Sequence, residues 1–120
     1  MNHKLFGAIV ELVSDMTHLK ETEIFQKSRK KAYVDARYLI MYIARQLDIK
    51  PVYIQRFFIL KGFELHYTTL FHASNRIEED MKEDEYMKEM VDTILLQFDP
   101  TRVIKKYPNK EYINQGCYLK

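Results

Sequence analysis

Two short stretches of this chain carry side chains suited to binding a polyanion. The first is Lys27-Ser28-Arg29-Lys30-Lys31, in which four cationic side chains can neutralise phosphate groups. The second is His66-Tyr67-Thr68-Thr69-Leu70-Phe71-His72-Ala73, whose hydroxyl and imidazole groups could meet base edges. Two apolar segments of helical length separate the stretches. The spacing therefore predicts a helix-turn-helix module preceded by a basic loop.

Each of these residues also has a purely structural explanation. A short basic run is usually a solvated surface. Thr68 and Thr69 could cap the first turn of a helix, because threonine hydroxyls accept hydrogen bonds from its free N–H groups. His72 could make a structural hydrogen bond, and Arg76 could pair with Asp80 one helical turn further on. The residues alone leave these alternatives open.

Catalytic chemistry finds little support in the sequence. The four histidines, His3, His18, His66 and His72, do not have the spacing of a metal site. The many acids between residues 78 and 85 are explained by an exposed acidic helix end, without a general acid or base. We expect a protein that is not an enzyme and holds no cofactor or metal.

Composition and length indicate one helix-rich domain. The chain has 120 residues, of which 47% are hydrophobic, and only three glycines and three prolines, which favours helices joined by short loops. The single cysteine, Cys117, can form no internal disulfide, which fits a reducing cytoplasm. No stretch approaches the roughly 20 apolar residues of a membrane span, and the N-terminus does not resemble a secretory signal. We expect a soluble cytoplasmic protein, associated with the nucleoid, without a membrane partner.

Charge is unevenly distributed along the chain, although the formal net charge is only +2. Residues 27–37 carry +4, residues 76–92 carry −5 and residues 99–120 carry +3. A polyanion is therefore expected at the basic loop and not at the acidic segment.

Hydrophobic periodicity predicts an all-α, compact helical bundle. We expect an amphipathic helix from about Leu5 to Met16, a very apolar central helix over 34–47, and a helix that starts at Pro51 and ends near Phe58, burying Ile54 and either Phe57 or Phe58. Gly62 is the expected turn residue. A candidate recognition helix follows from about Tyr67, and a last helix begins near residues 83–85. The state of residues 17–26 is left open, with Ile24 and Phe25 as a possible apolar plug. Residues 1–98 are taken as the domain and 99–120 as a basic, tyrosine-containing tail, extended or partly ordered.

Three segments together resemble a known family. They are the basic loop Lys27-Ser28-Arg29-Lys30-Lys31, the apolar helix Arg37-Tyr38-Leu39-Ile40-Met41-Tyr42-Ile43-Ala44-Arg45-Gln46-Leu47, and Thr68-Thr69-Leu70-Phe71-His72-Ala73. The order of these segments resembles the C-terminal DNA-binding domain of the bacterial replication initiator DnaA, in the superfamily of the Trp repressor. The resemblance covers roughly residues 5 to 97.

The resemblance implies particular roles for particular residues. Arg29 is expected in the minor groove, Lys27, Lys31 and Arg37 at phosphates, and Thr68 and Thr69 at base edges or thymine methyl groups. The neighbouring Ser28, Lys30 and His72 complete the expected DNA surface. Where the family has Arg-Asp-His before the threonines, this chain has Leu65-His66-Tyr67. His66 or Tyr67 could replace the missing base readers.

The sequence thus indicates a sequence-preferring double-stranded DNA-binding protein that acts at replication-origin-like or operator sites. It has no nucleotide-binding glycine-rich loop, so we expect a stand-alone module, of the kind that a phage or mobile element could carry. The alternative is a protein-interaction module, for instance an inhibitor of a replication factor, that keeps the fold without reading DNA. A Trp-repressor-like ligand switch is a third, weaker alternative.

Overall fold

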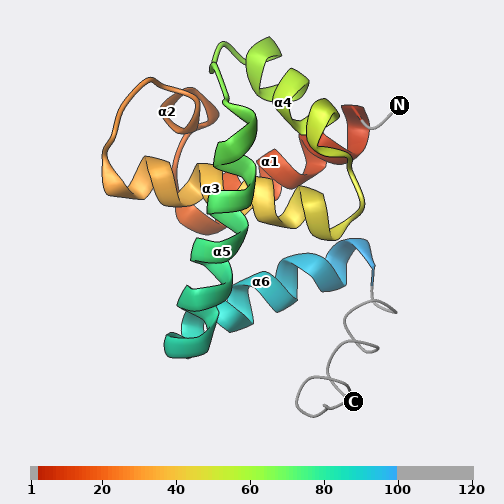
Figure 1. Ribbon diagram of the computed structural model, residues 1–120. Helices are drawn as coiled ribbons and strands as arrows, with labels where there is room; N and C mark the ends of the chain where they lie inside the picture. Colours follow the sequence, from red (N-terminus) through yellow and green to blue (C-terminus); the bar gives the residue numbers. More distant parts are fainter. Residues whose placement is uncertain (1–2, 100–120) are drawn as a thin grey trace.

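The computed structural model describes residues 3–99, and this part of the chain forms helices and no strand (Figure 1). The helices are α1 (His3–Thr17), α2 (Glu21–Ile24), α3 (Lys31–Gln46), α4 (Pro51–Leu60), α5 (Tyr67–Glu83) and α6 (Glu85–Phe98). The expected all-α bundle is confirmed. The expected tail over 99–120 lies, apart from Asp99, outside the described residues.

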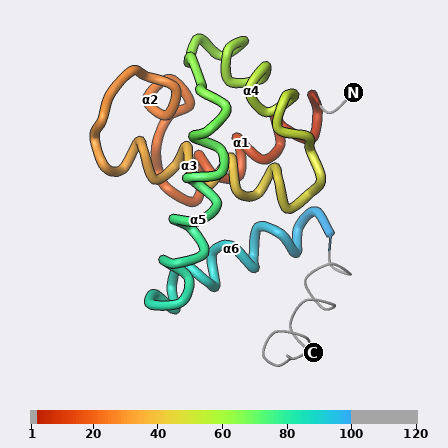
Figure 2. The backbone as a smooth tube through the Cα atoms, viewed as in Figure 1, coloured from red at the N-terminus to blue at the C-terminus, as the bar shows by residue number. Residues whose placement is uncertain are grey.

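The central position of α3 follows from its composition. Its residues from Leu39 to Ala44 are all buried. These six successive residues go more than once round the helix, so other elements must cover this part of it on every side. Helices α1, α5 and α6 all pack against α3, and α5 runs across it in the view of Figure 2. The core therefore forms around α3, as the sequence predicts.

Helix α1 is amphipathic and buries the side chains that the periodicity indicates: Phe6, Ile9, Val10 and Val13. It ends at Thr17, one residue beyond the expected end. The next residue, His18, has a φ of 60°, which turns the chain out of the helix. Asp48 has a φ of 68° and reverses the chain in the same way after α3.

The segment whose state the sequence left open forms the short helix α2 and acts as an apolar plug. Ile24 has no exposed surface and Phe25 is buried, with the Phe25 ring edge-on to Phe58 at a centroid distance of 5.2 Å. On α4, Pro51 occupies the first turn, and both Phe57 and Phe58 are buried. The helix runs to Leu60, two residues further than expected. This aromatic contact joins the segment that ends α2 to α4.

The turn between α4 and α5 is built on Gly62, whose φ of 87° lies in the left-handed region that glycine tolerates best. The Gln55 side-chain amide donates a 2.8 Å hydrogen bond to the Leu65 carbonyl and so fixes the exit of this turn. His66 is the N-cap residue of α5 and makes no side-chain cap. The capping role considered for Thr68 and Thr69 is therefore not adopted, because both lie within the helix.

Candidate nucleic-acid interface

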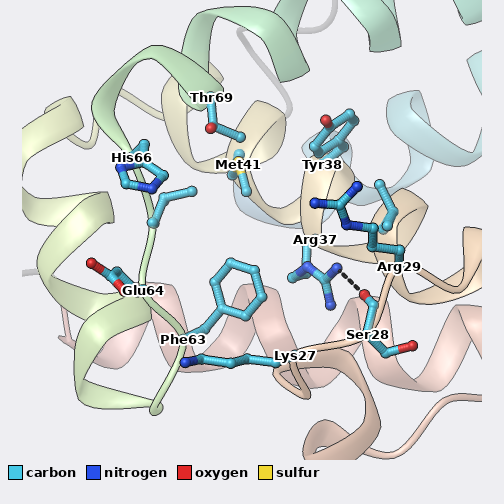
Figure 3. Close-up of a pocket in the computed structure, with 12 residues that line it drawn as sticks. Lys27, Ser28, Arg29, Arg37, Tyr38, Met41, Phe63, Glu64, His66 and Thr69 are labelled. Atoms are coloured by element: carbon cyan, nitrogen blue, oxygen red, sulfur yellow. Dashed lines mark hydrogen bonds between the residues drawn. The ribbon is translucent and has the colours of Figure 1, made fainter.

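The basic loop and the start of α5, although about 40 residues apart, border a single open groove of about 360 Å³ (Figure 3). Lys27, Ser28 and Arg29 line its loop side, and His66 and Thr69 line its helix side. The remaining lining side chains are Val34, Arg37, Tyr38, Met41, Phe63, Glu64 and Leu65. The fold thus brings together the two stretches that the sequence singled out.

The groove has a mostly apolar floor and a polar rim. Met41 and Leu65 are buried at its base, whereas Lys27, Arg29 and His66 are exposed. Within residues 3–99, neither Lys27 nor Arg29 forms an ion pair. Their charges face solvent and are available to an anionic partner.

The basic loop, residues 27–31, and the residues just before it are shaped by a few short-range contacts and by Arg37. The Ser28 hydroxyl accepts a 3.1 Å hydrogen bond from the Lys30 amide, and the Gln26 carbonyl accepts one of 2.7 Å from the Ser28 amide. Arg37, in the second turn of α3, adds three hydrogen bonds to main-chain carbonyls of residues 24–28. Its Nη1 donates to Ile24 at 2.8 Å and to Gln26 at 3.0 Å, and its Nη2 donates to Ser28 at 2.7 Å.

Arg37 occupies a position that differs from the one implied by the family resemblance. A phosphate contact requires an accessible guanidinium, but Arg37 is only 5% exposed and its outer nitrogens are bonded to carbonyls. Burial lowers the pKa of the Arg37 guanidinium from its usual value, because the charged form loses hydration. The sequence missed this placement because the carbonyls that receive Arg37 belong to a segment without a hydrophobic period.

The start of α5 presents its residues on two sides. Leu70, Ala73 and Ile77 face the core. Thr68 and His72, four residues apart, are exposed on the opposite side, while Thr69 is half-buried and turns toward the groove. Thr68 and His72 are thus displayed at the surface, and Thr69 is placed next to the basic loop.

The start of α5 also carries an exposed aromatic pair, Tyr67 and Phe71, which the sequence did not indicate as a pair. Phe71 is 43% exposed, and the Tyr67 ring meets it edge-on at a centroid distance of 5.5 Å. The Arg45 guanidinium lies 4.8 Å from the Phe71 ring centroid. Tyr67 was singled out from the sequence, but Phe71 and Arg45 were not. The four-residue spacing of Tyr67 and Phe71 is the signal that could have indicated the pair.

Some cations near the interface are already engaged. Lys31 Nζ lies 2.8 Å from Asp35 Oδ2, and Lys30 Nζ lies 5.2 Å from the Tyr33 ring centroid. Arg76 pairs with Asp80 at 3.5 Å, which confirms the acid-paired alternative considered for it. The least engaged cations of the loop are therefore Lys27 and Arg29.

Over residues 3–99, no three His, Cys, Asp or Glu side chains are placed so that they could hold a metal ion together. Among the helices described, none combines the length and the apolar character needed to cross a membrane.

Comparison with known proteins assigns the fold to a family. Residues 7–77 match the sequence model of the bacterial DnaA protein helix-turn-helix family, which is more than half of the chain. The chain belongs to this family. The matched region contains the basic loop, α3, α4 and the part of α5 that borders the groove.

The chain is also similar to part of a longer protein. It is 27% identical over 93 residues to the chromosomal replication initiator protein DnaA of Lachnoclostridium phytofermentans, an alignment that covers 78% of this chain. The alignment covers 20% of that protein, so the chain spans about a fifth of the length of this DnaA relative.

Proposed function

We propose that this member of the DnaA helix-turn-helix family binds double-stranded DNA through the basic loop and the start of α5. The observation that carries the proposal is the groove at which these two elements meet. Loop cations without an ion-pair partner lie on one side, and exposed hydrogen-bonding side chains begin a helix on the other. In this arrangement the start of α5 would enter the major groove of the duplex, and the basic loop would enter the adjacent minor groove.

Each residue has a proposed part in this binding mode. Arg29 enters the minor groove, because a guanidinium suits its narrow, negative surface. Lys27, Lys30 and Lys31 contact phosphates, and Ser28 keeps the loop in shape through its bond to the Lys30 amide. Arg37 is not included among the phosphate contacts, since it is buried.

The base readers are proposed on α5. Thr68 and His72 are exposed on the outer side of the helix and would reach base edges. Thr69, His66 and Tyr67 would contact the strand that passes the groove. The protein would act by occupying replication-origin-like or operator sites in the cytoplasm, with no reaction of its own.

The proposal is tested by fluorescence-anisotropy titration of the full chain with two DNA duplexes, each at several salt concentrations. One duplex has a random sequence, and the other, the origin-box duplex, carries a DnaA-type replication-origin sequence. We expect affinity to fall steeply as salt rises, because phosphate contacts release counterions, and to differ between the two duplexes. No binding at low salt would overturn the proposal. Salt-dependent binding without preference would leave DNA binding standing and overturn sequence reading.

A second candidate function is that of a protein-interaction module, such as an inhibitor of a replication factor. It is favoured by Leu65-His66-Tyr67, which replaces the family's Arg-Asp-His, and by the acidic end of α5. Pull-down with a nuclease-treated host lysate separates the two candidates. A stoichiometric partner that binds the chain equally well after the loop cations are replaced by serine would favour this candidate over DNA binding.

A further inference from the structure

One buried side chain contacts both the segment that forms the basic loop and the turn that leads into α5. Arg37 is the only charged residue that is buried within residues 3–99. Its three hydrogen bonds go to the carbonyls of Ile24, Gln26 and Ser28, at 2.8, 3.0 and 2.7 Å, where the chain leaves α2 and enters the basic loop. Figure 3 shows Arg37 reaching Ser28 at the inner end of the basic loop. The main chain just before Arg29 is therefore tied to α3.

The same guanidinium also contacts the turn that leads into α5. Its central carbon lies 4.4 Å from the centroid of the Phe63 ring, a cation–π geometry. Phe63 itself meets Phe58 edge-on at 5.9 Å, so the ring is anchored on α4. Phe63 follows Gly62 directly and stands four residues before Tyr67. One planar group thus lies between the loop and the turn.

The chemistry of these contacts requires arginine and not merely a cation. Within the described residues Arg37 has no carboxylate partner, so carbonyl dipoles and a ring face compensate its charge. A guanidinium has N–H donors spread across a rigid plane, which lets it reach three carbonyls and still offer a flat face to an aromatic ring. The compact ammonium of a lysine has one donor centre and no face to stack.

We propose that Arg37 is a positioning residue that holds the basic loop and the entry to α5 at a fixed separation, so that Arg29 and Thr68 engage the same DNA duplex together. This proposal rests on the proposed DNA binding and goes beyond it, since Arg37 acts without touching DNA. Without the three hydrogen bonds, the loop keeps its charges but no longer presents them in one place. The ordering of the loop would then have to accompany binding and would weaken it.

The first test measures by anisotropy whether the effects of Arg37→Lys and Arg29→Ala on DNA affinity are coupled. The Arg37→Lys variant keeps the positive charge and removes the planar guanidinium with its separate N–H donors. We expect its affinity for duplex DNA to fall roughly tenfold. In the Arg37→Lys background, Arg29→Ala should lose most of its effect, because Arg29 is no longer held in place, while Thr68→Val should keep its effect. Fully additive losses for Arg37→Lys and Arg29→Ala would overturn the proposal.

A second test needs no DNA and so separates this proposal from the proposed function. Trypsin cleaves after Lys27, Arg29, Lys30 and Lys31 only when the loop opens, and mass spectrometry locates each cut. Arg37→Lys should raise cleavage in the loop about tenfold and leave cleavage after Lys82 on α5 unchanged. A parallel rise at both places would indicate general destabilisation and overturn the positioning role. Loop protection in a wild-type chain that fails to bind DNA would refute the proposed function alone.

Matched variants keep both tests interpretable. Arg56→Lys makes the same exchange on an exposed α4 residue and should change neither loop cleavage nor DNA affinity. Phe63→Leu keeps an apolar side chain and removes the ring that faces Arg37. Like Arg37→Lys, it should increase loop cleavage and reduce DNA affinity. If both loop cleavage and DNA affinity stay unchanged, the role assigned to the turn is overturned.

Discussion

Arg76 of α5 pairs with Asp35 of α3, with 3.4 Å between Nη2 and Oδ1. The other oxygen of Asp35 lies 2.8 Å from Nζ of Lys31, at the end of the basic loop. One carboxylate therefore pairs with two cations, one at the end of the basic loop and one further along α5 than the proposed interface. Its negative charge also lies beside the surface that would meet phosphates, so it reduces the attraction of that surface for DNA.

Asp35→Asn should consequently strengthen DNA binding. Removing the charge frees Lys31 and leaves Arg76 paired with Asp80 alone. Because the Asp35 side chain is 34% exposed and screened by solvent, we expect a gain of roughly two- to fivefold in affinity. Anisotropy titration at low salt measures the change. The matched control is Asp92→Asn, which alters an ion pair with Lys88 on α6. Equal gains from both variants would show that overall charge, and not the position of Asp35, is responsible.

Arg29→Ala and Thr68→Val should affect DNA binding in different ways. Loss of Arg29 should weaken binding to all duplexes and reduce the slope of log affinity against log salt by about 1. Loss of the Thr68 hydroxyl should leave that slope unchanged and cost about 1 kcal/mol or more on preferred sequences only. Competition titrations over a duplex library check both effects. Equal losses on every duplex for both variants would refute this division between positioning and reading.

The packing of α4 predicts a large loss of stability for one residue and almost none for its neighbour. Phe58 has no exposed surface and contacts the rings of Phe6, Phe25 and Phe63, so Phe58→Ala should lower the free energy of unfolding by about 3–5 kcal/mol. Ile59 is 53% exposed, and Ile59→Ala should change it by about 0.5 kcal/mol or less. Urea denaturation followed by circular dichroism measures both values, and comparable losses would contradict the assigned packing.

Two glycines should respond in opposite directions to the same substitution. A Cβ at either Gly7 or Gly62 meets no atom within 4 Å, so steric clash is absent at both. Gly62 has a φ of 87°, and Gly62→Ala should cost about 1–2 kcal/mol of stability. Gly7 lies within α1, where alanine is favoured by about 0.5–1 kcal/mol. Thermal unfolding should show a lower Tm for Gly62→Ala and a higher one for Gly7→Ala; shifts of the same sign would contradict the turn geometry.

The helices were predictable because their signals are local. The apolar spacing from Phe6 to Val13, the proline at position 51 and Gly62 each act through neighbouring residues or through one buried face. The choice between Phe57 and Phe58 was not local, since α1 and α2 supply the rings that bury both. Helix α2 was also undecided, because four residues are too few to show a period.

Residue types and spacing, and then the family resemblance, singled out the basic loop and the start of α5. The structure places both at one groove, and their role in DNA binding stays a prediction. The resemblance also implied a phosphate contact for Arg37, whereas the structure buries Arg37 under carbonyls from residues 24–28. That difference depends on contacts across up to 13 residues, which no periodicity expresses. The stacking of Arg45 on Phe71 is equally a product of helix packing.

Amide chemical-shift mapping can locate the face of the molecule that binds duplex DNA. The isotope-labelled full chain is titrated with a duplex that carries a DnaA-type origin sequence. If the basic loop and the start of α5 form the binding face, the largest shifts fall on residues 27–31 and 66–72, and residues 83–85 at the acidic α5–α6 corner do not change. Shifts concentrated at that corner, or no shifts at low salt, would show that this face does not bind DNA.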